Sequence, residues 1–268
     1  MLGSVPTMAV TWILEPDLMP DVHARLRAAA LAAQQTVETW SGRPPTPRPD
    51  SFVLFHGSLG LAAELAPNPP WQPGAMCNTH EFTCSTWYPE AAPYLAHRQW
   101  HILPASVIVQ KREQVYGDLR LGQAAFFRPN SPLKPFSGRV VKLHELTLEA
   151  LDHGFYYDDP HLSVVIAPVR EIGREWRYIV YKHTVLTGSA YQATTRTAEV
   201  DDPTGPPWRY ACQVAKALTP PDPLYVLDIA EVDGDLRLME LNPFSGADLY
   251  ACDLKPVVEA VQDLARTT

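Results

Sequence analysis

The segment from Tyr225 to Gly246, YVLDIAEVDGDLRLMELNPFSG, constrains the fold of this chain more than any other. Residues 225–232 are rich in side chains that favour strands, and residues 236–241 repeat that character. Between them, the run Asp233-Gly234-Asp235 is typical of a tight turn. The pattern therefore predicts a β-hairpin.

Three potential metal ligands lie on this hairpin. Glu240 and Asn242 are two residues apart on the second strand, so their side chains share a face, and Asp228 can reach the same volume from the first strand. Two carboxylates and an amide oxygen suit Mg²⁺, which fills its remaining positions with water and phosphate oxygens. Both acids lie in apolar runs, where a carboxylate needs a partner or a metal, so we expect a magnesium site here. The turn residues Asp233 and Asp235 are instead expected to be solvated.

Composition and charge limit the classes of protein to which the chain can belong. The chain has 268 residues, 46% of them apolar, which is typical of a globular protein with one large domain or two to three small ones. The net charge of −8 argues against a nucleic-acid partner. No apolar run has the length of a membrane span, and the N-terminus lacks the features of a signal peptide.

The four cysteines have no framework spacing, so we expect a reducing cytoplasm. Cys77, His80 and Cys84 are spaced closely enough to be considered as zinc ligands. Their spacing matches no closed zinc pattern and no fourth ligand follows nearby, which favours buried or partly exposed thiols with a bystander histidine.

Strand and helix patterns alternate in the first hundred residues. Residues 8–14 and 51–55 read as strands, and residues 20–40 have the composition of a helix with proline at its start. This alternation predicts a small α/β domain.

Strands dominate the rest of the chain. The sequence predicts strands at 105–110, 124–128, 139–143, 162–167 and 176–186. It predicts helices at 206–218 and 256–265, before and after the hairpin.

Two cations stand where a phosphate chain can be held, and a third is expected on the open side of its strand, where a substrate could bind. Arg128 ends an apolar strand, and Lys134 follows in a loop of turn-forming residues. On the strand EWRYIV, Arg177 shares a face with Glu175, opposite the aromatic residues that we expect in the core. Solvated surface charges remain the alternative for Arg128 and Lys134, and a cross-strand ion pair with Glu175 or another acid remains the alternative for Arg177.

An apolar strand runs into a proline-broken segment at residues 164–171, VVIAPVRE. An adenine ring needs an apolar slot with one backbone donor and one acceptor, and a strand-to-hinge segment supplies these. A plain buried strand is the alternative.

The order of these features resembles the ATP-grasp superfamily, over roughly residues 100–268. The segment Arg-Pro-x-x-x-x-Lys-x-Phe-x-Gly, from Arg128 to Gly138, is similar to the branch named for one arginine and two lysines. The resemblance implies an α/β (α+β) protein. A small N-terminal α/β domain, residues 1–100, would precede an ATP-grasp domain, residues 101–268, in which two antiparallel-sheet subdomains clasp the nucleotide.

The resemblance also implies roles for single residues. One or two Mg²⁺ ions bridging the nucleotide phosphates would be bound by Asp228, Glu240 and Asn242. Phosphate contact and catalysis would fall to Arg128, Lys134 and Arg177. The nucleotide would further contact Ile166, Ala167, Val169 and Lys182, and Glu171 would contact its ribose. The acceptor side would be lined by Tyr191 and Arg196.

The activity that this implies is an ATP- and Mg²⁺-dependent ligase that joins a carboxylate to an amine. The carboxylate attacks the γ-phosphate, and the acyl phosphate then meets the amine, with release of ADP and phosphate. Small-molecule or peptide carboxylates and amines are the expected substrates. The alternative is a nucleotide-binding module without ligase activity that acts through a protein partner. The sequence leaves the identity of the substrates and the oligomeric state open.

Overall fold

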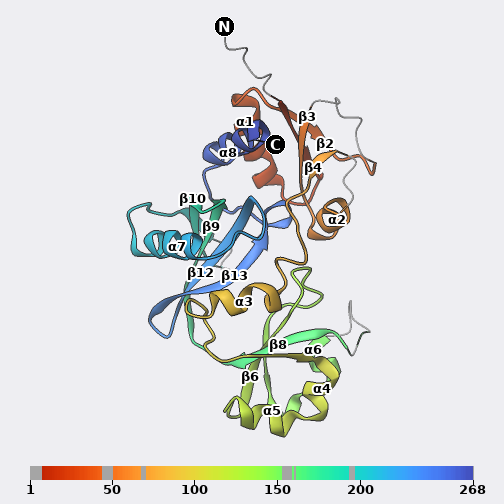
Figure 1. The fold of residues 1–268 in the computed structure, drawn as a ribbon, viewed down its shortest axis with the longest axis vertical. Helices are drawn as coiled ribbons and strands as arrows, with labels where there is room; N and C mark the ends of the chain where they lie inside the picture. Colours follow the sequence, from red (N-terminus) through yellow and green to blue (C-terminus); the bar gives the residue numbers. More distant parts are fainter. Residues whose placement is uncertain are drawn as a thin grey trace. The chain divides into compact units, whose positions relative to one another are not determined.

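The computed structural model describes residues 8–43, 51–67, 71–152, 159, 161–192 and 197–267. The chain forms two compact units (Figure 1). The first unit comprises Met1–Asn78, Arg174–Ile229 and Glu240–Thr268. The second unit comprises Thr79–Gly173 and Ala230–Met239. The domain boundary expected at residue 100 stays a prediction.

A parallel sheet opens the first unit. Its strands in spatial order are β2 (Thr36–Thr39), β1 (Ala9–Leu14), β3 (Ser51–His56) and β4 (Gln72–Gly74). The two inner strands are almost continuously apolar, AVTWIL and SFVLFH, as is usual for parallel strands that are covered on both faces.

Helices cover both faces of this sheet. On one face α1 (Pro20–Ala32) and α8 (Lys255–Thr267) pack against β1 and β3, and Figure 1 shows the two helices side by side. On the other face α2 (Leu59–Leu65) joins a second core.

An antiparallel sheet follows, of which most residues belong to the first unit. Its strands in spatial order are β11 (Thr197–Val200), β10 (Thr184–Gln192), β9 (Ile172–Tyr181), β12 (Leu224–Val232) and β13 (Asp235–Pro243). The helix α7 (Pro206–Ala217) packs on β10, and the short helix η2 (Phe244–Gly246) follows β13. The predicted hairpin is confirmed: only Asp233 and Gly234, both with positive φ, join β12 to β13. This is the geometry of a two-residue hairpin turn.

The second unit holds another antiparallel sheet. Its strands in spatial order are β5 (His101–Pro104), β8 (Ser163–Pro168), β6 (Ala124–Pro129) and β7 (Arg139–Lys142). Its helices are α3 (Cys84–Ala91), α4 (Ala105–Gln110), α5 (Arg112–Asp118), η1 (Leu143–Glu145) and α6 (Leu148–Asp152). Apolar side chains from α4, α5 and α6 form a core with the face of the sheet that carries Phe127 and Ile166. Parallel and antiparallel sheets with helices confirm the predicted fold class.

Residues 105–110 form a helix, although their β-branched run predicted a strand. Ala105 and Ile108, three residues apart, are both fully buried, so burial selects a helical face. The β-branched residues Val107, Ile108 and Val109 had favoured the wrong structure.

Two other boundaries differ from the prediction. The helix α1 ends at Ala32, and Thr36–Thr39 instead form an edge strand that pairs with β1. The single strand predicted at 176–186 is two strands, because a turn at Lys182, with φ of 54°, reverses the chain. None of the described helices combines the length and apolar character that crossing a membrane requires.

Two histidines are buried in the first unit and contact each other. His23 Nε2 lies 3.0 Å from His56 Nδ1, and His56 Nε2 lies 3.1 Å from the Ala247 carbonyl oxygen. Burial lowers the pKa of His56 to about 3, aided by the charge of His23, and burial also lowers the pKa of His23. The unfolded chain therefore binds more protons than the folded chain below pH 6.5.

We expect the free energy of unfolding to fall as the pH drops from 6.5 toward 3, by about 1.4 kcal/mol per pH unit for His56, and the lowered pKa of His23 adds to the loss in the same direction. Urea denaturation at pH 7.5 and pH 5 measures this loss. His56→Gln should flatten the pH dependence, whereas His80→Gln, at a side chain that is 81% exposed, should not. An equal pH dependence in His56→Gln and the parent would assign the acid sensitivity to other groups.

Candidate active site

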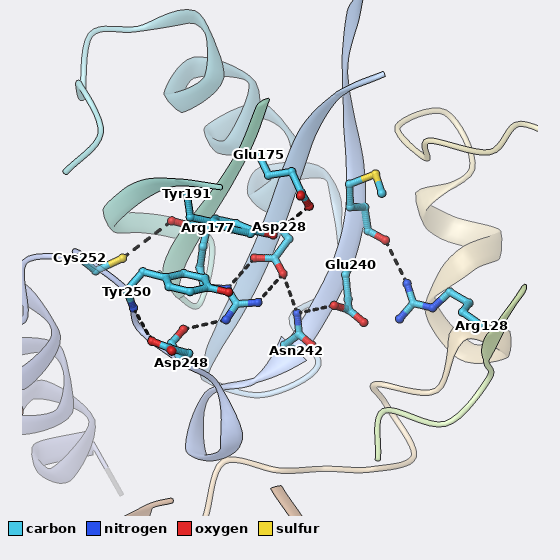
Figure 2. A network of polar contacts seen from close by, with 11 residues as sticks. Arg128, Glu175, Arg177, Tyr191, Asp228, Glu240, Asn242, Asp248, Tyr250 and Cys252 are labelled. Atoms are coloured by element: carbon cyan, nitrogen blue, oxygen red, sulfur yellow. Dashed lines mark hydrogen bonds and ion pairs between the residues drawn. The ribbon is translucent and has the colours of Figure 1, made fainter. Parts of the chain in front are cut away.

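Three side chains meet where β12 and β13 lie side by side, and we call Asp228, Glu240 and Asn242 the acid–amide cluster. Asn242 Nδ2 donates to Asp228 Oδ2 at 3.0 Å and to Glu240 Oε2 at 3.1 Å (Figure 2). Asp228 and Asn242 are 3% and 5% exposed, whereas Glu240 is half-buried. The structure thus brings together the three residues that the sequence predicted as metal ligands.

Arg177, on the neighbouring strand β9, binds the cluster through Asp228. Its Nε and Nη2 donate to the two carboxylate oxygens of Asp228 at 2.8 and 2.7 Å, and its Nη1 donates to the Asp248 carbonyl at 2.7 Å. This is the cross-strand ion pair that the sequence left open as the alternative. Burial acts to lower the pKa of Arg177, but the charge of Asp228 outweighs it and holds the pKa above its ordinary value. Arg177 therefore stays charged and fixes the orientation of Asp228.

Two stacked tyrosines border the guanidinium. The rings of Tyr191 and Tyr250 lie 4.5 Å apart and nearly parallel, and the Arg177 guanidinium lies 4.9 Å from the Tyr250 ring and 5.8 Å from the Tyr191 ring (Figure 2). Tyr191 Oη donates to Glu175 Oε2 at 3.0 Å. Burial raises the pKa of Glu175, against the lowering effect of this hydrogen bond. These contacts keep water from the ion pair, which strengthens its electrostatics.

Tyr250 and Asp248 had no sequence prediction. Tyr250 has φ of 42°, a left-handed conformation that is rare for a bulky side chain. The main chain around it is held by side chains far away in the sequence: Arg25 donates to the Tyr250 and Cys252 carbonyls, and Arg177 donates to the Asp248 carbonyl. No local pattern in the sequence could have indicated these contacts.

The donor set of the acid–amide cluster fits a hard divalent cation. Mg²⁺ accepts one or two carboxylates and takes its other oxygens from water and phosphate. Asp228 Oδ1 keeps a lone pair beyond the one used by Arg177. Among the described residues, no group of three or more His, Cys, Asp and Glu side chains is arranged to hold a metal. A metal here would therefore depend on Asn242 and on substrate oxygens besides the two acids.

The cations Arg128 and Lys134 belong to the second unit. Arg128, at the end of β6, lies on the sheet face opposite Phe127 and the core, and its Nη1 donates to the Met239 carbonyl at 3.2 Å. Lys134 is exposed in the loop between β6 and β7, with φ of 49°. A side chain at Gly138 would lie 3.0 Å from the Phe126 ring, so glycine allows the loop to approach the sheet closely.

The hinge segment, residues 168–171, begins at the last residue of β8. Ile166 and Ala167 are fully buried in β8, whereas Val169 is 44% exposed and Glu171 is exposed. Of the residues predicted to meet the base, only Val169 thus offers an accessible side chain.

A further predicted residue, Lys182, does not join the cluster. Lys182 lies in the β9–β10 turn with its Nζ 4.7 Å from the centre of the Tyr181 ring, roughly 16 Å along the strand from Arg177. Arg196 lies outside the described residues. Cys77 and Cys84 are buried and form no disulfide.

Comparisons with known proteins agree with the fold of the chain. The fold resembles D-cycloserine synthetase DcsG, with a TM-score of 0.68 and 11% identity, over 96% of this chain and 100% of that chain. It resembles an ATP-grasp RimK domain protein from Sphaerobacter thermophilus, with a TM-score of 0.62 and 13% identity, over 95% and 99% of the two chains. For D-alanine–D-alanine ligase from Bacillus anthracis the TM-score is 0.59 and the identity 14%, over 98% and 99%. None of the curated proteins matches the chain.

The family match and the fold define an ATP-grasp protein, the class that includes ATP-dependent ligases forming C–N bonds. Residues 72–262 match an ATP-grasp domain family, the third family of the clade named for one arginine and two lysines. The chain belongs to this family. The predicted ATP-grasp fold, and the branch indicated by Arg128 and Lys134, are confirmed.

Proposed function

We propose that the chain is an ATP- and Mg²⁺-dependent ligase that joins a carboxylate to an amine through an acyl phosphate. The observation that carries the proposal is the acid–amide cluster held by the buried Arg177–Asp228 pair. Membership in an ATP-grasp family supports it, as do the names ligase and synthetase of two structures that the fold resembles.

The residues divide the work by charge. Asp228, Glu240 and Asn242 would hold Mg²⁺, which when bound neutralises charge on phosphate oxygens. Arg177 keeps Asp228 in a single orientation. Arg128 and Lys134 would contact the nucleotide phosphates.

Val169 and the neighbouring Ile172, 44% and 40% exposed, would form the apolar slot for adenine, with Glu171 near the ribose. Tyr191 would face the acceptor, and Arg196 is proposed for that side from the sequence alone.

Bond making and breaking take place between the substrates. A carboxylate oxygen attacks the γ-phosphorus, and the bond to the bridging oxygen of ADP breaks. The amine nitrogen then attacks the acyl carbon, phosphate leaves with the C–O electron pair, and the nitrogen loses a proton to solvent. The protein positions and neutralises, so no nucleophilic side chain is required. We place the reaction in the cytoplasm, in keeping with four cysteines that form no disulfide.

Calorimetry and ADP release test the proposal separately. ATP with Mg²⁺ should produce a heat of binding, and its absence would reject the nucleotide site. ADP should then appear only when both a carboxylate and an amine are added. Amino acids and short peptides can be screened as the two substrates, with ADP release as the readout. Binding of ATP without ADP release in any pair would favour a nucleotide-binding module that acts through a protein partner.

The proposed phosphate contacts predict a specific effect of Arg128→Lys. A fixed arginine binds a phosphate with two hydrogen bonds, whereas lysine is a point charge, so the ATP affinity should fall about tenfold although the charge is kept. Lys134→Ala should also raise the ATP requirement, with little effect on folding because its loop side chain is exposed.

Both variants should bind adenosine like the parent, since adenosine lacks the phosphates. Arg112→Lys, an exposed arginine on α5, is the matched control and should bind ATP normally. Parent-like ATP affinity in Arg128→Ala and Lys134→Ala together would show that the two residues are ordinary surface charges.

A further inference from the structure

The turn of the β12–β13 hairpin is bonded to the hinge segment. Asp233 Oδ1 accepts a hydrogen bond from the Glu171 N–H at 3.1 Å, and Asp233 Oδ2 accepts one from Arg170 Nη1 at 3.2 Å. In return the Asp233 N–H donates to the Glu171 carbonyl at 3.0 Å. All three residues belong to the second unit. Asp233 is exposed, as expected for a turn residue, with 48% of its side chain accessible, but it also makes bonds that the sequence did not indicate.

The turn itself does not require these bonds. An aspartate followed by glycine suits the two positive φ values, 51° and 85°, and asparagine would suit them equally well. The partners Arg170 and Glu171 lie more than sixty residues earlier in the chain. An ion pair this exposed adds little to stability, so its main effect is on the geometry of the hinge.

The bonds decide which hinge groups can meet a nucleobase. Asp233 takes the N–H of Glu171, and Pro168 has no N–H. A base that needs a main-chain donor is left with Val169 and Arg170. Val169 is also the hinge residue with an exposed apolar side chain.

We infer that Asp233 is a positioning residue for the nucleotide base: it fixes Arg170 and Glu171 so that Val169 presents its main chain and side chain to the ring. The inference rests on the proposed function. Asp233 would raise the affinity for the base without contacting it, and the phosphates would be bound by other residues.

Two substitutions distinguish the effect of the side-chain hydrogen bonds from the effect of the turn conformation. Asp233→Gly keeps the positive φ and removes both side-chain bonds. Asp233→Asn keeps an oxygen for the Glu171 N–H and removes the charge opposite Arg170. Asp235→Asn is the matched control, because Asp235 begins β13 and pairs with Arg237 rather than with the hinge.

Asp233→Gly should raise KM for ATP and the Kd for adenosine about tenfold, with kcat at saturating ATP within about twofold of the parent. Inorganic triphosphate should bind both proteins equally. Asp233→Asn should recover part of the lost affinity, and Asp235→Asn should equal the parent. The thermal midpoint should change little in all three.

Three results would speak against the inference. Parent-like adenosine affinity in Asp233→Gly would overturn it while leaving the proposed function intact. An equal loss for adenosine and triphosphate would show a general disturbance of the unit instead of a base-specific effect. If Asp233→Gly does not fold, parent-like adenosine affinity in the milder Asp233→Asn overturns the inference. A parent protein that binds neither ATP nor adenosine would reject the proposed function itself.

Discussion

Replacing Glu240 with glutamine should abolish turnover, with kcat reduced by at least about 100-fold, and leave the fold intact. Glutamine keeps the shape and one oxygen, so the hydrogen bond from Asn242 can persist. What is lost is the negative charge that the proposed Mg²⁺ site needs. Because Glu240 is half-buried near the end of β13, the change should cost little stability.

ADP release at saturating ATP and Mg²⁺, together with the thermal midpoint, measures both parts of this expectation. Asn242→Ala should also abolish turnover, since Asn242 joins the two carboxylates. The control is Glu231→Gln, an exposed acid on the same hairpin. Parent-like turnover in Glu240→Gln would mean that the carboxylates are structural.

The sequence could predict this site because its determinants are local. The Asp-Gly turn sets the register of the hairpin, and the period of two on a strand places Glu240 and Asn242 on one face. The position of Asp228 near these two residues follows from the pairing of the two hairpin strands. All three could be assigned before any tertiary contact was known.

The surroundings of the cluster could not be predicted, because they depend on contacts between distant segments. Asp248 lies 71 residues from Arg177, yet its carbonyl accepts one of the guanidinium N–H groups. The left-handed backbone of Tyr250 has no signature in the sequence. Asp233 likewise looks like a simple turn residue until the hinge is placed against it. Helix α4 was missed because tertiary burial of Ala105 and Ile108 overrides local propensity.

Arg177→Met should destabilise the protein strongly, by about 3–5 kcal/mol, because it leaves Asp228 as an unpaired charge that is only 3% exposed. The stability of Arg177→Lys should lie between that of the parent and that of Arg177→Met, since lysine keeps the charge but cannot bind both oxygens of Asp228. Urea denaturation measures these losses. A cost below about 1 kcal/mol for Arg177→Met would mean that water reaches the pair and screens it.

The double variant Arg177→Met with Asp228→Asn separates stability from chemistry. Removing both charges should restore most of the free energy of unfolding, since the net contribution of a buried ion pair is small once neither partner is left alone. Turnover should not return, because the acid–amide cluster would have lost Asp228 and the arginine that orients it. A stable double variant that still releases ADP with a carboxylate and an amine would show that the pair serves the fold only. The predicted contact of Arg177 with the transferring phosphate would then be wrong as well.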